Sequence, residues 1–287
     1  MKSSADLASR PLPSGTPFDR ILVPLDGSGA AERVLTTVRA IHQRHASQVV
    51  LLRVVQPKSG DRESLPPVEV VTIADLYLRK VAADLDKQGV PVKTVVRSGE
   101  IVRSIREVAV EERSSMIALS THGRMTSPSA PYGPTAAEVL RSSAIPVLAV
   151  PSHAADTDHF SGTVLVPLTG AGPADDIVPV AAAFASSFGL DLAVLLELLT
   201  PAGTGRADAE RLVRAEEHLA KLAAPFELNQ IPTVRLAQTG DPVGAILAVA
   251  EERQADIIAL GSAGGAMTEG LLRASRIPVL TGPRRQL

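Results

Sequence analysis

The chain has 287 residues, a formal net charge of −2 and no cysteine. The missing cysteines exclude a disulfide scaffold, thiol catalysis and Cys-ligated metal sites, and the near-zero charge offers no broad attraction for nucleic acid or an anionic membrane. Apolar residues make up 45% of the chain but aromatic residues only 2%, so the core must consist of Val, Leu, Ile and Ala, as is typical of buried parallel strands.

The first residues of the chain, MKSSADLASRPLPSGTPFDR, lack the apolar segment of a signal peptide. No run in the sequence approaches the roughly 20 apolar residues that a membrane-spanning helix needs. The absence of cysteine is compatible with a reducing compartment. We therefore expect a disordered tail over residues 1–17 on a soluble, cytoplasmic protein that has neither membrane nor nucleic acid as a partner.

The first half of the chain alternates short apolar runs with stretches of helical periodicity. From Ala30, for example, apolar residues recur at the spacing of one helix face. Alternating strands and helices predict βαβ units with right-handed crossovers and a parallel sheet. The predicted strands are Arg20–Leu25, Gln48–Val55, Pro91–Val96, Met116–Ser120 and Ile145–Val150.

The second half of the chain repeats the first. ILVPLDGSGAAE, which starts at Ile21, returns as VLVPLTGAGPAD from Val164. Polar residues without an apolar period separate the halves, so we expect domains over residues 18–151 and 163–287 with a linker over 152–162. The second domain should have five strands of its own, near Thr163–Leu168, Asp191–Leu196, Thr233–Ala237, Asp256–Leu260 and Ile277–Leu280.

The repeat is broken at one loop. The ten-residue interval between Gly123 and Gly133 (133 − 123) shrinks to one between Gly264 and Gly265 (265 − 264), so nine residues are missing while the flanking sequence still matches. Thr169 also stands where the first half has an aspartate. We predict that the second domain is a degenerate domain that binds no nucleotide; a smaller ligand in the shortened crevice is the alternative.

The intact loop follows a predicted strand and leads into a helix. Gly123 lets a backbone N–H approach an anion, Gly133 precedes a helix N-terminus that attracts phosphate, and Thr135 adds a hydroxyl group. The alternative is a flexible connection. At the end of the first strand, the carboxylate of Asp26 is placed either to accept hydrogen bonds from ribose hydroxyls or to cap the following helix.

These motifs resemble the universal stress proteins in their tandem two-domain form. The resemblance runs from Ile21 to Pro283 and rests on VPLDGS, on LLRVV where the family commonly has LLHV, and on the closing IPVLAV and IPVL strands. The family's ATP signature is Gly, two residues, Gly, nine residues, Gly, then Ser or Thr. The spacing is intact here, but Ser120 replaces the first Gly and Pro134, which has no N–H, replaces Ser or Thr.

The resemblance implies an α/β fold of two Rossmann-like, adenine nucleotide alpha hydrolase-like domains. Each would have a five-stranded parallel sheet of order 3-2-1-4-5, with the ligand crevice between strands one and four. The fifth strands of the two domains would pair as an intramolecular pseudo-dimer, and a further homodimer would be compatible with this arrangement. The implied nucleotide-binding residues are Pro24, Leu25, Asp26, Val54, Leu119, Ser120, Thr121, His122, Gly123, Arg124, Gly133, Pro134 and Thr135.

By the same resemblance, we expect a cytoplasmic stress-response protein that binds ATP, with or without Mg²⁺, in its first domain. It would act as a nucleotide-dependent switch or adaptor for an unidentified protein partner. The competing interpretation is an interaction module that no longer binds nucleotide. We predict no catalytic or metal-ligating residue and at most slow ATP hydrolysis, since the sequence shows no positioned general base. The absence of an SGGxDS or HIGH-type loop argues against an enzyme of the same superfamily.

Overall fold

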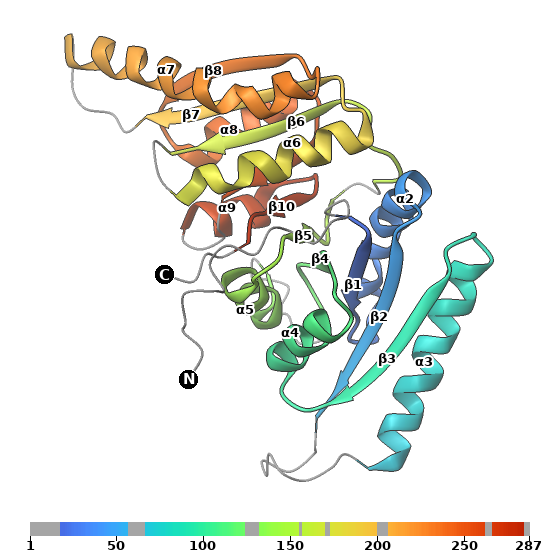
Figure 1. The fold of residues 1–287 in the computed structure, drawn as a ribbon. Coiled ribbons are helices and arrows are strands. Elements are labelled where there is room, and N and C mark those ends of the chain that lie inside the picture. The colour runs from blue at the N-terminus through green and yellow to red at the C-terminus, as the bar shows by residue number, and fades with distance from the viewer. Residues whose placement is uncertain are drawn as a thin grey trace, which may run out of the picture.

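A computed structural model of the chain describes residues 18–56, 67–123, 132–154, 157–169, 173–199, 206–261 and 266–283. These residues form two α/β halves that share one ten-stranded sheet (Figure 1). The predicted tail over residues 1–17 lies outside the described residues. Among the described helices, none combines the length and the apolar character needed to cross a bilayer.

The first half contains five strands and five helices among its described residues. Its strands are β1 (Arg20–Pro24), β2 (Gln48–Val55), β3 (Val92–Ser98), β4 (Met116–Ser120) and β5 (Val147–Val150). Its helices are α1 (Gly29–Glu32), α2 (Val34–His45), α3 (Val68–Asp86), α4 (Ile101–Glu111) and α5 (Pro134–Ser142).

The second half repeats this arrangement. Its strands are β6 (Thr163–Leu168), β7 (Leu192–Leu199), β8 (Thr233–Thr239), β9 (Ala255–Leu260) and β10 (Val279–Thr281). Its helices are the 3₁₀ turn η2 (Pro173–Asp176), α6 (Ile177–Phe188), α7 (Arg206–Leu228), α8 (Pro242–Glu252) and α9 (Ala266–Ala274).

The strand order confirms the predicted topology. The sheet runs β3-β2-β1-β4-β5-β10-β9-β6-β7-β8, which is the order 3-2-1-4-5 in each half. Within each half all pairs are parallel, and β5 pairs with β10 antiparallel with Leu148 opposite Leu280. The predicted pairing of the fifth strands is therefore confirmed, and it covers the apolar edge that each half would otherwise expose.

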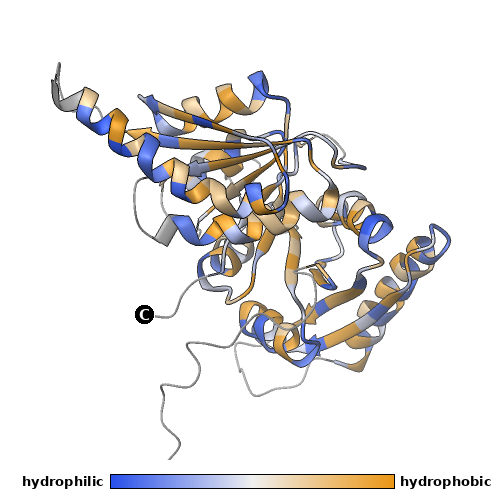
Figure 2. Cartoon of the chain, turned by 45° about the horizontal axis from the view of Figure 1, so that its top comes forward, coloured by the Kyte–Doolittle hydropathy of each residue, from blue (hydrophilic) through white to orange (hydrophobic). Residues whose placement is uncertain are grey.

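Both faces of the sheet are buried, as the aliphatic composition predicts. On β2, Val49 and Leu51 belong to the core on one face, while Val50 and Leu52 belong to the core on the other. Figure 2 shows the strands largely in apolar colours, whereas polar residues mark the outer sides of many helices. Helices therefore cover both faces of the sheet, and the ends of the strands stay open for a ligand.

Most predicted strands have the observed bounds or differ by one or two residues, but β7 was predicted too short. The predicted Asp191–Leu196 ignores the continuation through the polar Glu197 to Leu199. The register with β8 continues without a break to Leu199 opposite Thr239, so backbone pairing extends the strand past a residue that ends its apolar pattern.

The aromatic residues hold the two halves together beside the shared sheet. Phe18 precedes β1, yet its ring lies 5.2 Å from Phe184 and 5.9 Å from Phe188 on α6, measured between centroids. Phe160, which belongs to the predicted linker, lies 5.1 Å from both α6 rings. His45, at the end of α2, lies 4.6 Å from Phe188. The linker therefore contributes to a common core.

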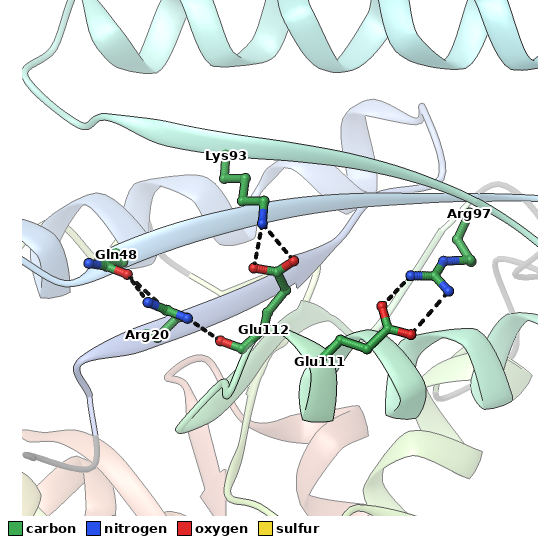
Figure 3. Close-up of polar contacts among 6 residues, drawn as sticks. All are labelled: Arg20, Gln48, Lys93, Arg97, Glu111 and Glu112. Atoms are coloured by element: carbon green, nitrogen blue, oxygen red, sulfur yellow. Dashed lines mark hydrogen bonds and ion pairs between the residues drawn. The ribbon is translucent and has the colours of Figure 1, made fainter. Parts of the chain in front are cut away.

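Charged side chains fix the end of α4 against the β2–β3 edge of the sheet (Figure 3). Lys93 donates to both carboxylate oxygens of Glu112 at 2.8 Å, and Arg97 forms a two-pronged ion pair with Glu111. Arg20 donates to the backbone carbonyl of Glu112 and to the side chain of Gln48. Exposed pairs of this kind contribute up to about 1 kcal/mol each. Together they hold α4 in a fixed position over the sheet.

Candidate functional site

A cavity of about 350 Å³ opens where the strand order reverses, at the carboxyl ends of β1 and β4. Ligands of open α/β sheets characteristically bind at this position. All of the residues predicted for the site except Arg124, which lies outside the described residues, line this one cavity. They are Pro24, Leu25, Asp26, Val54, Leu119, Ser120, Thr121, His122, Gly123, Gly133, Pro134 and Thr135.

Asp26 supports a helix cap without being the cap. Its Oδ1 atom accepts hydrogen bonds from the backbone N–H of Ser28 at 2.9 Å and from the Ser28 hydroxyl at 2.6 Å. The hydroxyl oxygen of Ser28 then accepts from the N–H of Ala31 at 3.2 Å and caps α1. One carboxylate oxygen thus orients the β1–α1 turn, and Asp26 still lines the cavity.

Gly123 touches Asp26 across the crevice. A Cβ atom built on Gly123 would lie only 2.4 Å from the Asp26 Oδ2 atom, so no larger residue fits without moving the carboxylate. Residues far apart in the sequence therefore meet at the same wall of the cavity. The requirement for glycine at this position comes from this close approach.

Hydrogen bonds close the base of the loop between β4 and α5. The N–H of Gly133 donates to the carbonyl of Thr121 at 2.7 Å, and the N–H of Thr121 donates to the carbonyl of Val150 at 3.0 Å. His122 is anchored as well, because its Nδ1 atom lies 3.0 Å from both the Thr121 and the Ser152 hydroxyl oxygens. The two ends of the loop are thus held side by side at the cavity.

The first turn of α5 forms another part of the wall. Gly133 is the N-cap, Pro134 is the first helical residue, and the earliest intrahelical bond runs from Ala137 N–H to Gly133 C=O at 3.0 Å. The N–H groups of Thr135 and Ala136 therefore have no acceptor within the helix. Both residues line the cavity, so this turn offers two backbone N–H groups and the Thr135 hydroxyl group to a ligand.

The two departures from the family signature have different local consequences. The Ser120 hydroxyl is buried and has no hydrogen-bond partner among the described residues, so serine in place of glycine adds no exposed donor to the cavity. Pro134 removes one N–H from the helix N-terminus. The Gly133 N–H already donates to the carbonyl of Thr121. Fewer backbone N–H groups are therefore available to an anion than the spacing of the signature suggests.

Sequence reasoning missed several residues of the cavity wall. Ile101 and Ile105, one turn apart on α4, form its apolar side together with Val70 of α3. Arg53 of β2 adds a cation, and its Nη1 atom donates to the carbonyl of Leu25 at 3.3 Å. The helical spacing of the two isoleucines was visible in the sequence. The direction in which α4 faces was not.

The polar side of the cavity adjoins a hydrogen-bonded pair between α3 and α1. The Tyr77 hydroxyl donates to Glu32 Oε1 at 2.8 Å. Burial, this hydrogen bond and the charges of Glu32 and Asp26 raise the pKa of Tyr77 well above its ordinary value, against the opposing charge of Arg53. Tyr77 therefore remains a neutral donor at physiological pH.

The geometry defines a tandem α/β protein with a crevice where the strand order reverses in its first half. The sequence model of the universal stress protein family matches residues 17–151 and 161–281, and the chain belongs to this family. Its similarity to the universal stress protein Sll1654 of Synechocystis sp. is 32% identity over 136 residues, which cover 47% of this chain and 86% of that protein.

Solved structures support the tandem fold. A universal stress protein from Archaeoglobus fulgidus superposes with a TM-score of 0.69 at 22% identity and covers 93% of this chain and 99% of its own. The protein PA1789 of Pseudomonas aeruginosa, of unknown function, superposes with a TM-score of 0.65 at 15% identity over 93% of both chains. At these identities, the likeness establishes the shared fold.

Proposed function

We propose that the chain binds ATP in the cavity of its first domain and acts as a nucleotide-dependent switch or adaptor in a cytoplasmic stress response. The observation that carries this proposal is the convergence of Asp26, Gly123 and the α5 N-terminus on one cavity. Its volume of about 350 Å³ lies at the lower end of the range of ligand pockets.

The walls of the cavity differ in chemistry, which suggests an orientation for the nucleotide. Pro24, Asp26 and Val54 would border the adenine and the ribose, whose hydroxyls would donate to the Asp26 carboxylate. Leu119–Gly123 would follow the ribose and the phosphates. The phosphate tail would lie at Gly133–Thr135, where backbone amides and the helix dipole attract negative charge.

Magnesium would enter this site with the nucleotide. Within the described part of the chain, no group of three or more His, Asp or Glu side chains is arranged to hold a metal ion. Mg²⁺ commonly binds through phosphate oxygens and water with few protein ligands. We propose at most slow ATP hydrolysis, because hydrolysis would need a general base. The Asp26 carboxylate is not free for this role, since it already accepts two hydrogen bonds from Ser28.

A route for a switch runs through the sheet. β4 carries the start of the candidate phosphate loop and pairs with β5, which in turn pairs with β10 of the second domain. We infer that nucleotide occupancy would alter the β4–α5 region and, through this pairing, the surface that the second domain offers to a protein partner.

The experiment is a calorimetric titration of the purified protein with MgATP, repeated for Gly123→Val and Gly264→Val. Valine at Gly123 should abolish binding because it displaces Asp26 and fills the phosphate path. Gly264, outside the described residues, is its counterpart in the sequence repeat, so the matched variant should bind as the wild type does. Equal losses in both variants would contradict a single site in the first domain.

The alternative function is a universal-stress-protein-like interaction module that no longer binds nucleotide. The observation in its favour is the reduced amide set: Pro134 has no N–H and the Gly133 N–H serves Thr121. Mass spectrometry of small molecules released from the purified protein distinguishes the two functions. Released adenine nucleotide supports the switch. Its absence, together with no titration heat at millimolar MgATP, supports the module.

A further inference from the structure

The second domain contains a cleft of its own, at the position that corresponds to the β2–α3 side of the first-domain cavity. It has a volume of about 440 Å³ and lies between the carboxyl end of β7 and one face of α7. Thr169, which follows β6, lies at its edge. Since Thr169 corresponds to Asp26, the cleft belongs to the shortened crevice, for which the sequence left a smaller ligand as the alternative.

Four basic side chains of α7 line the cleft. Arg211, Arg214, His218 and Lys221 recur at intervals of three and four residues, which places them on one face of the helix. The arginines and the lysine are exposed, whereas His218 is partly buried. The helix thus presents a row of cations along one wall.

His218 forms the floor of the cleft with two carboxylates. Its Nδ1 atom lies 2.9 Å from Glu197 Oε2 of β7, and its Nε2 atom lies 3.0 Å from Asp175 Oδ2 of η2. Burial lowers the pKa of His218, but the hydrogen bonds to Glu197 and Asp175 outweigh burial and raise it above the ordinary value. A protonated imidazole donates to both acids, and its positive charge offsets one of the two carboxylate charges.

The charge balance of the lining residues therefore favours an anion. The acids at the cleft are Glu197, Glu217 and, beneath the wall, Asp175. The cations are Arg211, Arg214, Lys221 and the protonated His218, so the cleft keeps a net positive charge. Arginine presents a planar fork of donors that matches phosphate oxygens, and lysine adds a point charge.

Comparison of the two halves indicates that this cationic wall is not a requirement of the fold. Leu78 and Leu219 are both fully buried and lie 141 residues apart (219 − 78), which aligns α3 with α7. At this offset, Ile73, 66% exposed, corresponds to Arg214, and the apolar Val70 corresponds to Arg211.

The second strand of each half also differs in charge, but here the basic residue is in the first half and the acidic residue is in the second. Pro24 lies opposite Leu52 and Pro167 opposite Leu196, so the next residues, Arg53 and Glu197, are counterparts. The first domain has its cation on the strand and apolar residues on the helix. In the second domain, the strand has the acid and the helix has the cations.

We propose that the cleft between β7 and α7 is a second ligand site, which binds a small phosphate-bearing molecule. Arg211, Arg214 and Lys221 would contact the phosphate oxygens, and the Thr169 hydroxyl would add a donor at the far edge. The site is independent of ATP binding in the first domain.

The test is a calorimetric titration with inorganic pyrophosphate at constant ionic strength. Wild-type protein should show saturable binding at millimolar concentration, and Arg214→Gln/Lys221→Gln should weaken it about tenfold or more. Lys80→Gln is the matched control, because Lys80 is the exposed counterpart of Lys221 on α3. The control should bind pyrophosphate as the wild type does.

Two results would overturn the proposal. One is the absence of saturable pyrophosphate binding by the wild type. The other is an equal loss in Lys80→Gln, which would show non-specific attraction to surface lysines. Thermal unfolding of each variant verifies that the exposed substitutions leave the fold intact.

Discussion

At the scale of single residues, the contact between Gly123 and Asp26 is the most sensitive point of the site. We expect Gly123→Ala to lower the free energy of unfolding by about 1 to 3 kcal/mol, since the new Cβ forces the carboxylate away from Ser28. Urea denaturation followed by circular dichroism measures this change.

The control for this substitution is Gly29→Ala in α1. A Cβ on Gly29 would meet no atom within 4 Å, and alanine favours the helix. The free energy of unfolding should therefore stay the same or rise by up to about 1 kcal/mol. An equal loss in both variants would show that the Asp26 contact is not the cause.

Pro134 limits the affinity that the proposed nucleotide site can reach. Pro134→Ser restores an N–H at the first helical position, and a hydrogen bond to a charged group contributes about 1.5 to 3 kcal/mol. MgATP binding should therefore tighten by about tenfold to a hundredfold, as measured by calorimetry. Pro242→Ser, at the start of α8 in the second domain, is the matched control and should leave the affinity unchanged. An unchanged affinity in Pro134→Ser would contradict a phosphate contact at this turn.

The sequence predicted the turn residues of the first-domain cavity better than it predicted the residues of the cavity's apolar side. Motif spacing identified Asp26, Gly123 and Gly133, because the backbone at Gly123 approaches the Asp26 carboxylate closely and Gly133 is the N-cap of α5. Arg53 and Ile105 occupy ordinary strand and helix positions. Their part in the cavity depends on how α4 and β2 face each other, which residue patterns do not encode.

At the scale of elements, the His218 ion triad joins α7 to β7 and η2. Because hydrogen bonds to Glu197 and Asp175 raise the pKa of His218 in spite of burial, its contribution to stability is fully present below the unfolded pKa of 6.5. The contribution is lost as the pH rises through the folded value. We expect the wild-type free energy of unfolding to fall above pH 6.5, and His218→Gln to flatten this dependence.

Two other histidines allow the effect of His218 to be distinguished from the titration of the other histidines. Burial lowers the pKa of His45, so its contribution is lost on the acid side, as the pH falls below 6.5. His159 is exposed, and its ion pair with Asp158 should contribute little. His159→Gln should therefore keep the wild-type decline above pH 6.5. If His218→Gln keeps it as well, the triad does not stabilise the second domain.

The triad also explains why the end of β7 was mispredicted. Glu197 interrupts an apolar run, which in isolation indicates the end of a strand. Its carboxylate is instead buried against a histidine that lies on a helix later in the chain. Such a long-range partner leaves no local signal in the sequence.

At the scale of the whole molecule, the sequence predicted that the fifth strands pair, but it did not predict the second connection between the halves. The sparse aromatic residues gave little reason to expect a cluster. The polar linker likewise concealed Phe160, which is buried against α6. Phe18, Phe160 and the α6 pair Phe184 and Phe188 come from three separate segments, so only the folded chain brings them together.

We expect Phe184→Ala to weaken the coupling of the two halves. The substitution removes a fully buried ring that contacts Phe18 of the first half and Phe160 of the linker, at a cost of about 3 to 5 kcal/mol. Hydrogen exchange measured by mass spectrometry should then show faster exchange in α6 and also in β1, which follows Phe18. Phe226→Ala is the control, since Phe226 is equally buried but lies on α7 within the second half. Its effect should stay in the second half. Faster exchange confined to the second half in Phe184→Ala would mean that the β5–β10 pairing alone joins the domains.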